Sequence, residues 1–434
     1  MSARFGNLTF AVPIALFLSG CATGPPALSD ISNAKTEARV QLSPQIALLN
    51  VPVREARAVI DSDGHVHVLA ISRSRDLYYL AIGPEGVTNP VIIRAEVTPH
   101  YWSPVNFGAA FDHVGHLHVL VNQNHLLLED GLWRDAQPAP PCGQLLTVGQ
   151  DLVCAFLTKG DEIGSPGRWD WFAFYGLVLP WHFRSTKLVI ARLTPDGSSG
   201  WTVIDPDGNR DVKAFSLATD NQGTVHIFYI HGRFFLLAED VQPAYAHLDS
   251  RAGHLSLETG TNPSQQDRDQ IVMATNTGKA ITGMSDLCPN RHLSTALAVD
   301  PESGTSMIVA CVIELSFPDF GKLVWKSVTI RAGTEDPPTS LQLHEQDFPI
   351  VRRFSDPHLA PAGRNQFHAV MTWDVDTLYY LCFADGTWST PTVLGSIGGG
   401  DEAIQLVSDH RGRALAIWPS TNGSLVARWI ELMQ

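Results

Sequence analysis

Asp61-Ser-Asp-Gly64-His-Val-His67 is the stretch that decides the fold, because the chain repeats it. Two further copies are Asp112-His-Val-Gly115-His-Leu-His118 and Asp220-Asn-Gln-Gly223-Thr-Val-His226. Each copy lies between two apolar stretches. Asp suits the first position of a type I turn because its carboxylate accepts bonds from nearby backbone N–H groups, and Gly suits the fourth, where φ is positive. The phrase therefore predicts a β-hairpin, and its recurrence predicts a repeat architecture.

Weaker versions of the same turn fill the rest of the chain. They are Gln150-Asp151, Asp300 to Gly304, Ala362-Gly363 and Asp409 to Gly412. A second repeated element is a Gly–Trp strand start, seen at Trp133, Trp201 and Trp388. The best unit contains four strands, as in Leu378–Phe383 followed by Asp385-Gly-Thr-Trp388. We therefore expect an all-β chain with a single β-propeller, seven four-stranded blades being favoured and six or eight left open.

The two ends of the repeat region are predicted to meet. The last unit, Ile404 to Leu432, holds only about three strands. The segment Val40 to Val53 could supply the missing N-terminal strand and close the ring, which would remove two exposed sheet edges. A pair of β-sandwiches would not explain one turn returning along the whole chain. A parallel α/β fold would need helical segments between the strands, and almost none are visible.

The N-terminus has the pattern of a targeting segment. Arg4 precedes an apolar run from Leu8 to Leu18, and Leu18-Ser-Gly-Cys21 follows. This tetrad resembles the bacterial lipoprotein processing box, which implies that Cys21 receives diacylglycerol; an ordinary secretory signal with a chance Cys is the alternative. By the same resemblance, Ala22 favours the outer membrane. We expect a signal peptide over residues 1–20, a lipidated Cys and flexible tether over 21–36, and the propeller over 37–434.

Charge and hydropathy narrow the partners. The formal net charge is −14, so no basic field exists to replace the counterions of a nucleic acid, and a nucleic-acid partner is not expected. No later apolar run is long enough to span a bilayer. The expected partners are a membrane, through the lipid, and a protein or saccharide ligand.

Five cysteines remain once Cys21 carries lipid. An oxidising compartment permits disulfides. Cys142 and Cys154 flank a short strand and are the first choice for a pair, with Cys288 and Cys311 second. Cys382 lies within an apolar strand and is expected to be a buried thiol.

The repeated histidines are predicted to be structural rather than metal ligands. Each of His67, His118 and His226 directly follows its own turn, where the Asp carboxylate or a backbone carbonyl is a ready partner. No Cys/His spacing resembles a metal site, and neither a metal nor another cofactor is expected.

Ligand binding is expected on loops where the repeats differ. The segment Lys159 to Lys187 is rich in aromatic residues, which indicates either a buried subdomain or added strand pair, or an exposed docking surface. A second insertion ends in paired arginines that could bind an anion or form a surface ion-pair network. The candidate ligand-binding residues are Arg168, Trp169, Trp171, Tyr175, Trp181, Arg352, Arg353 and Asp374.

The repeated phrases resemble those of the sialidase-like (BNR-repeat) propeller superfamily over most of the chain. That family's Asp-box reads Ser-x-Asp-x-Gly-x-Thr-Trp, whereas Asp385-Gly-Thr-Trp388 lacks the residue between Asp and Gly. Neither an arginine triad nor a Tyr/Glu nucleophile pair can be aligned. The favoured function is a lipid-anchored, non-catalytic propeller that binds a protein or saccharide through its loop rim. The alternative is a glycan-acting hydrolase or lyase with a site in the central mouth.

Overall fold

In the computed structural model of the chain, the repeated strands lie within the unit Glu37–Gln434. The structure describes residues 39–97, 107–122, 124–136, 139, 142–159, 168–174, 177–183, 186–194, 197–204, 211–235, 238–248, 250–251, 254–255, 285–286, 295–314, 322–331, 340–344, 357–372, 376–398, 401–409 and 412–433.

The strands in the first half of the unit form four sheets of four or five strands. The first sheet holds β3 (Val53–Ile60), β4 (Val66–Ser72), β5 (Leu77–Gly83), β6 (Gly86–Val87) and β7 (Val91–Arg94). The second holds β8 (Phe107–Phe111), β9 (Leu117–Val121), β10 (Asn124–Glu129) and β11 (Leu132–Asp135). The third holds β12 (Gln144–Val148), β13 (Asp151–Lys159), β16 (Thr186–Thr194) and β17 (Gly197–Ile204). The fourth holds β18 (Asp211–Thr219), β19 (Val225–Phe235), β20 (Ala238–Leu248) and β23 (Ser285–Asp286).

Three sheets follow in the second half. The fifth holds β24 (Thr295–Val299), β25 (Ser306–Glu314), β26 (Lys322–Arg331) and β27 (Ser340–His344). The sixth holds β28 (His358–Gly363), β29 (Gln366–Met371), β30 (Thr377–Ala384), β31 (Thr387–Trp388) and β32 (Thr392–Ser396). The seventh holds β33 (Gln405–Ser408), β34 (Arg413–Pro419), β35 (Leu425–Met433), β1 (Arg39–Leu42) and β2 (Ile46–Leu49). Two hairpins stand apart: β14 (Arg168–Phe174) with β15 (Leu177–Phe183), and β21 (Ser250–Arg251) with β22 (His254–Leu255).

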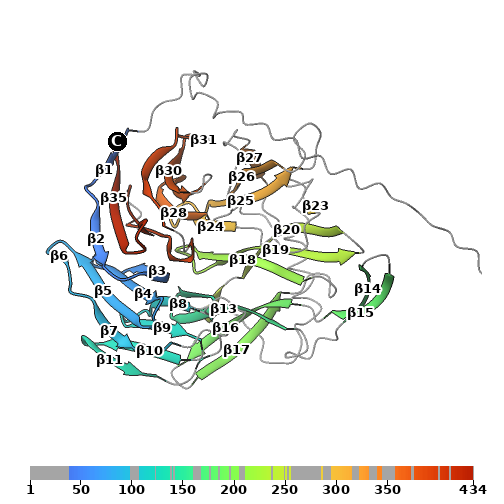
Figure 1. Cartoon of the computed structure of the whole chain (residues 1–434), viewed down its shortest axis with the longest axis horizontal. Helices are drawn as coiled ribbons and strands as arrows, with labels where there is room; N and C mark the ends of the chain where they lie inside the picture. The colour runs from blue at the N-terminus through green and yellow to red at the C-terminus, as the bar shows by residue number, and fades with distance from the viewer. Residues whose placement is uncertain are drawn as a thin grey trace, which may run out of the picture. The chain divides into compact units, whose positions relative to one another are not determined.

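The sheets are arranged around a common centre, as Figure 1 shows. The first strand of each sheet contacts the first strand of the next, in the order β3, β8, β12, β18, β24, β28, β33 and back to β3. Within the described residues the one helical element is the short 3₁₀ turn η4 (Asp401–Ala403). The predictions of an all-β chain and of a propeller arrangement are confirmed.

The N-terminal segment closes the last sheet. β1 pairs antiparallel with β35 from Arg39 opposite Met433 to Leu42 opposite Ile430. β2 pairs with the earlier part of β35, with Ile46 opposite Ala427. The expected single strand is thus two short ones. Pro44 lies between them, and it has no N–H to donate to a ladder.

The core lies between sheets that pack face to face. One apolar cluster joins the last sheet to the first, and Leu48, Val53, Leu415 and Leu425 are among its members. The repeated Trp also links sheets: Trp388 is 1 % exposed, and its Nε1 donates to Ser327 Oγ of the fifth sheet at 2.8 Å. Each sheet therefore buries its apolar face only when its neighbours are present.

The Asp–Gly turns join the first and second strands of their sheets. Gly64 N donates to Asp61 O at 3.2 Å, and the equivalent bonds at Gly115 and Gly223 are 3.1 Å. Gly64 has φ of 85° and Gly115 has φ of 93°, in the left-handed region that favours glycine. The carboxylate of Asp61 accepts from the backbone N–H groups of Asp63 and His65, as an Asx turn requires.

Candidate binding site

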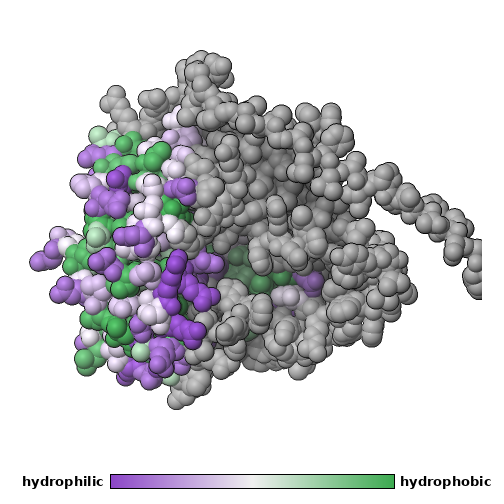
Figure 2. Space-filling view, in the orientation of Figure 1, coloured by the Kyte–Doolittle hydropathy of each residue, from purple (hydrophilic) through white to green (hydrophobic). Residues whose placement is uncertain are grey.

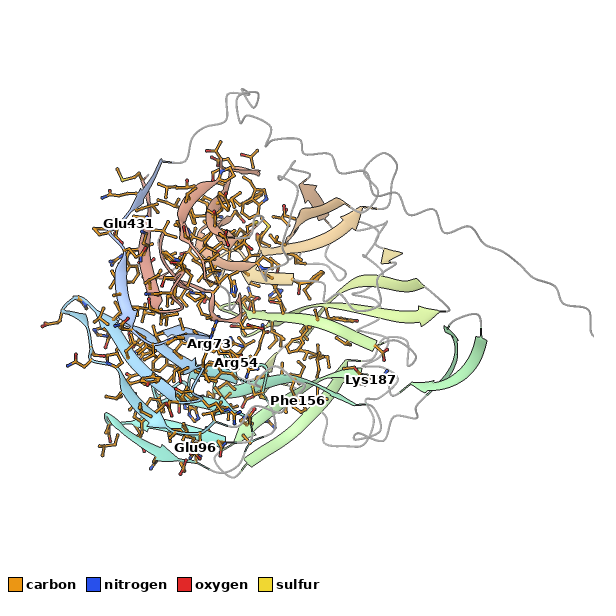
Figure 3. The ribbon with its side chains drawn as sticks, in the orientation of Figure 1. Arg54, Arg73, Glu96, Phe156, Lys187 and Glu431 are labelled. Atoms are coloured by element: carbon orange, nitrogen blue, oxygen red, sulfur yellow. The ribbon has the colours of Figure 1, made fainter. Side chains whose placement is uncertain are left out.

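Four basic or acidic residues lie on or beside the part of β3 that is farthest from its Asp turn. Arg54, Glu55 and Arg57 lie on β3, and Arg73 lies in the connection between β4 and β5. A backbone bond of 2.9 Å from Arg73 N to Pro52 O holds this connection beside β3. We call these four residues the β3 rim. Figure 3 labels Arg54 and Arg73 close together near the centre of the ring of sheets.

Glu55 is the buried member of the β3 rim. It is 3 % exposed, and its Oε1 lies 3.1 Å from Nη2 of Arg57. Burial raises the pKa of the Glu55 carboxyl to about 7, because the charged form loses solvation. Arg57 and Arg54 lower that pKa, and Glu402 of η4 raises it. The carboxyl therefore titrates near neutral pH.

Arg57 is held in place by three hydrogen bonds and by one contact with an aromatic ring. Its Nε donates to Phe107 O at 2.9 Å, and its Nη1 donates to Ala56 O at 2.7 Å. The guanidinium carbon lies 5.3 Å from the centre of the Phe107 ring, within cation–π range. Its side chain is still 27 % exposed. A fixed, partly exposed guanidinium can bind an anion with little loss of side-chain entropy.

The other arginines of the β3 rim face solvent. Arg54 and Arg73 are both exposed. Figure 2 shows hydrophilic residues gathered on the inner side of the described face, in the region where Figure 3 labels these two arginines. In a chain of net charge −14, this local excess of arginine can bind a carboxylate, sulfate or phosphate group.

The histidines of the Asp turns pair with the carboxylate of their own turn. His67 Nε2 lies 3.1 Å from Asp61 Oδ2, and the distances at His118–Asp112 and His226–Asp220 are 3.2 Å and 3.3 Å. Burial raises the pKa of these aspartates, but hydrogen bonds from backbone N–H groups of the turn and from the paired histidines, together with the charge of the histidines, lower it more, so the net shift is downward. Burial lowers the pKa of His67 and His118 more strongly than their aspartates raise it.

The second nitrogen of each of these histidines bonds to a different partner. Nδ1 of His67 lies 2.9 Å from Tyr79 Oη, and Nδ1 of His118 lies 2.8 Å from His125 Nε2. Nδ1 of His226 lies 3.1 Å from Oγ of Ser306 in the next sheet. Asp220, His226 and Ser306 thus have the order of a hydrolase triad, but Ser306 is 1 % exposed and no substrate can reach it. These rows of bonds fix the turns to the sheets.

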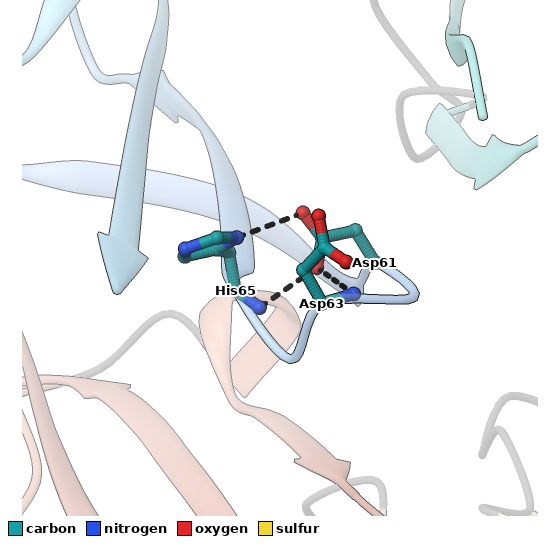
Figure 4. A group of neighbouring side chains, drawn as sticks. All are labelled: Asp61, Asp63 and His65. Carbon is teal, nitrogen blue, oxygen red and sulfur yellow. Dashed lines mark hydrogen bonds and ion pairs between the residues drawn. The ribbon is translucent and has the colours of Figure 1, made fainter. Parts of the chain in front are cut away.

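One Asp turn also has the composition of a cation site. Asp61, Asp63 and His65 each place one possible ligand atom within 4.8 Å of the others (Figure 4). The carboxylate of Asp61 is already used, since Oδ1 accepts two backbone bonds and Oδ2 lies 3.1 Å from His65 Nδ1. The hydrogen bonds of the turn account for the cluster.

The predicted ligand-binding residues fall into two groups. Arg168, Trp169, Trp171 and Trp181 lie on the hairpin of β14 and β15, where Arg168 is opposite Phe183 and Trp171 is opposite Pro180. The aromatic insertion is therefore a strand pair, one of the arrangements left open above. Tyr175, Arg352, Arg353 and Asp374 lie outside the described residues.

The cysteines correct one prediction. Cys142 and Cys154 are buried thiols and do not form the bridge given as first choice. Cys142 Sγ donates to Gln144 O at 3.0 Å. Burial raises the pKa of the Cys154 thiol, and a hydrogen bond with Cys142 raises it by a smaller amount. A buried thiol with a raised pKa holds little of the thiolate that forms disulfides. Cys382 is a buried thiol, as expected. Cys311 lies on β25, while Cys288 is outside the described residues, so that pair stays a prediction.

Solved structures similar to this chain share its fold at low sequence identity. An ulvan lyase of a polysaccharide lyase family, bound to a GlcA(1-4)Rha3S unit, is 10 % identical with a TM-score of 0.50, covering 89 % of this chain and 95 % of its own. Another polysaccharide lyase is 11 % identical with a TM-score of 0.49, covering 91 % and 100 %. A lectin from Burkholderia pseudomallei is 12 % identical with a TM-score of 0.48, covering 89 % and 99 %. The sequence matches no known family and no curated protein. At 10 % identity the likeness to the ulvan lyase supports the fold alone.

Among the described residues, no helix has the length and apolar character needed to cross a membrane.

Proposed function

We propose that this protein is a propeller that binds an anionic saccharide at the β3 rim. The observation that carries the proposal is a set of three arginines on or beside β3. Arg54 and Arg73 are exposed, Arg57 is partly exposed, and the backbone of Arg73 is bonded to Pro52. Guanidinium groups bind carboxylate and sulfate groups through paired hydrogen bonds. The likeness to an ulvan lyase supports a saccharide as the carrier of that charge, by fold-level analogy.

Dextran sulfate and dextran of the same length test this proposal, because they differ only in charge. We expect the protein to bind dextran sulfate and to bind dextran far more weakly in isothermal titration calorimetry. The double variant Arg54→Gln/Arg73→Gln should weaken binding on the order of 10- to 100-fold, since it removes two charge-assisted contacts. Binding should also weaken as NaCl is added.

The matched control for that experiment is Arg134→Gln. Arg134 is equally a surface arginine, with its side chain 59 % exposed, but it lies on β11 of the second sheet. Its loss should leave the affinity for dextran sulfate unchanged. Equal binding of dextran and dextran sulfate, or an unchanged affinity in the double variant, would remove the basis of the proposal.

A glycan-acting hydrolase or lyase is the second candidate, and Glu55 is the observation in its favour. A carboxyl with a pKa of about 7 can accept or donate a proton at neutral pH. Binding without turnover remains the first candidate because Glu55 is only 3 % exposed. The appearance of new reducing ends during incubation with dextran sulfate or polygalacturonate would favour the enzyme.

We also propose the blade count, the superfamily and the membrane anchor of this protein. Each of the seven sheets is one blade, which the closed order of contacts between first strands supports. The propeller is of the sialidase-like superfamily, as the repeated Asp–Gly and Gly–Trp phrases suggest. The chain is anchored in the outer membrane by lipid on Cys21.

The lipid anchor can be tested by replacing its attachment residue. The variant Cys21→Ala should move the protein from the membrane fraction to the soluble fraction of bacterial cells, because a chain without lipid loses most of its membrane affinity. Cys382→Ala, which removes a buried thiol of the propeller, is the control and should stay with the membranes. A Cys21→Ala variant that still sediments with the membranes would contradict the anchor.

A further inference from the structure

The buried Glu55 forms an ion pair with the partly exposed Arg57 at the place where the anionic ligand is proposed to bind. With Glu55 ionised, its Oε1 lies 3.1 Å from Arg57 Nη2, and the carboxylate cancels the charge of that arginine. With Glu55 protonated, Arg57 keeps its full charge and its contacts to Phe107 O and Ala56 O. The protonation state of one carboxyl therefore sets the charge that a ligand meets.

Few charged or ionisable groups other than Arg57 lie near the Glu55 carboxyl. Arg54 and Arg57 on its own strand and Glu402 on η4 are the charged groups that act on it. The adjoining strands β8 and β33 carry no ionisable side chain. The ionisable side chain of β4 is His67, which lies opposite Val59, four residues along β3 from Glu55.

We propose that Glu55 is a proton-operated gate on the β3 rim, so that an anionic saccharide binds there together with one proton taken up by Glu55. The inference rests on the proposed function. A bound anion repels the ionised carboxylate and attracts the arginines, so it favours the protonated acid. By linkage, protonation then favours the bound anion to the same degree. No bond other than the O–H of the carboxyl forms or breaks, and the proton comes from solvent.

The direction of the pH effect follows from the charges. Below pH 7 Glu55 is neutral and the β3 rim carries more positive charge, so the affinity for an anion is high. Above pH 7 the carboxylate is present and the affinity falls. Removing one negative charge beside a bound anion changes the binding affinity on the order of tenfold.

Calorimetry with a dextran sulfate oligosaccharide tests the gate, because sulfate esters do not titrate between pH 6 and 8.5. We expect the affinity to fall on the order of tenfold across that range. Titrations at pH 7 in imidazole and in Tris buffer, which differ in ionisation enthalpy and carry no anionic group that could compete for the site, should report net uptake of protons. Glu55→Gln should bind at pH 6 and at pH 8.5 with the affinity that the unaltered protein shows at pH 6. The variant should take up no proton on binding.

Glu85→Gln is the matched control, since Glu85 is an exposed carboxyl in the turn between β5 and β6. It should keep both the pH dependence and the proton uptake. Binding that is independent of pH, or a Glu55→Gln variant that keeps the original pH dependence, would overturn the gate and leave the saccharide proposal standing. Absence of binding at every pH would overturn both.

Discussion

His368 should make this protein lose stability in acid between pH 6.5 and pH 3, because its imidazole is held in the core without charge. The side chain is 0 % exposed, and burial lowers its pKa to about 3, with Asp409 opposing part of that effect. Nδ1 of His368 lies 2.7 Å from Tyr380 Oη, while Nε2 has no hydrogen-bond partner among the described residues. A proton on Nε2 would be a buried charge without compensation.

The sign and size of the effect follow from linkage. The unfolded chain binds a proton at His368 near pH 6.5, and the folded protein binds it only near pH 3. The contribution of His368 to the free energy of unfolding is therefore full above pH 6.5 and falls by about 1.4 kcal/mol for each pH unit below it, a loss of roughly 4–5 kcal/mol at pH 3. His67 and His118, whose pKa values burial also lowers, add loss in the same direction. Glu55 opposes the loss between pH 7 and pH 4.5, because its pKa is raised from 4.5 to about 7 and its protonation favours the folded protein.

Urea unfolding at pH 7, 5.5 and 4 measures the contribution of His368 as the difference between the unaltered protein and the variant His368→Asn. The variant should lose less stability than the unaltered protein as the pH falls, by about 1.4 kcal/mol for each pH unit below 6.5, because Asn does not titrate and can still bond to Tyr380. His113→Asn, at an exposed position of the second Asp turn, should keep the slope of the unaltered protein. A His368→Asn variant as sensitive to acid as the unaltered protein would show that other groups govern the pH dependence.

The repeated local pattern made much of the fold predictable. An Asp and a Gly three residues apart specify a tight turn by chemistry that needs no distant partner, and four such pairs, beginning at Asp61, Asp112, Asp220 and Asp409, each mark a separate sheet. The histidine that follows lies on the strand leaving the turn, within reach of the same carboxylate. Even the third sheet, whose turn lacks the Asp at its first position, was predicted from the apolar stretches on either side of Gln150.

Contacts between distant positions could not be predicted in this way. The bond from Trp388 to Ser327 joins residues 61 positions apart, and the His226–Ser306 contact joins residues 80 apart. The cysteine prediction failed for another reason: Cys142 and Cys154 do contact each other, but their spacing in the sequence does not reveal the burial that raises the pKa of the Cys154 thiol.

The β3 rim was missed although the sequence held a signal for it. The first strand of the first sheet reads Val-Arg-Glu-Ala-Arg-Ala-Val-Ile, with three charged residues where the other first strands are mainly apolar. A buried strand with charges must pair them or shift their pKa values, and either outcome often marks a functional site. The expectation that ligand-binding residues lie on loops did not cover the charged residues of this strand.

Weakening the closing strand β2 should destabilise the whole ring of sheets. Leu48 and Leu49 are 4 % and 5 % exposed, and they belong to the cluster that joins the last sheet to the first. Each buried Leu→Ala change costs about 2–5 kcal/mol, so the double variant Leu48→Ala/Leu49→Ala should lose on the order of 5 kcal/mol or more. Typical domains hold only about 5–15 kcal/mol in total. We therefore expect a large fall in the urea midpoint, measured by circular dichroism.

Hydrogen exchange separates two ways in which the double variant could fail. If β2 closes the ring, amides of its partner β35, such as Val426 and Ala427, should exchange as fast as those of sheets on the far side, because the sheets lose their packing together. Ala47→Ser, at an exposed position of the same strand, is the control and should change the midpoint little. Fast exchange confined to β35, with the other sheets still protected, would mean that the ring survives without its N-terminal closure, since β1 still pairs with the C-terminal half of β35.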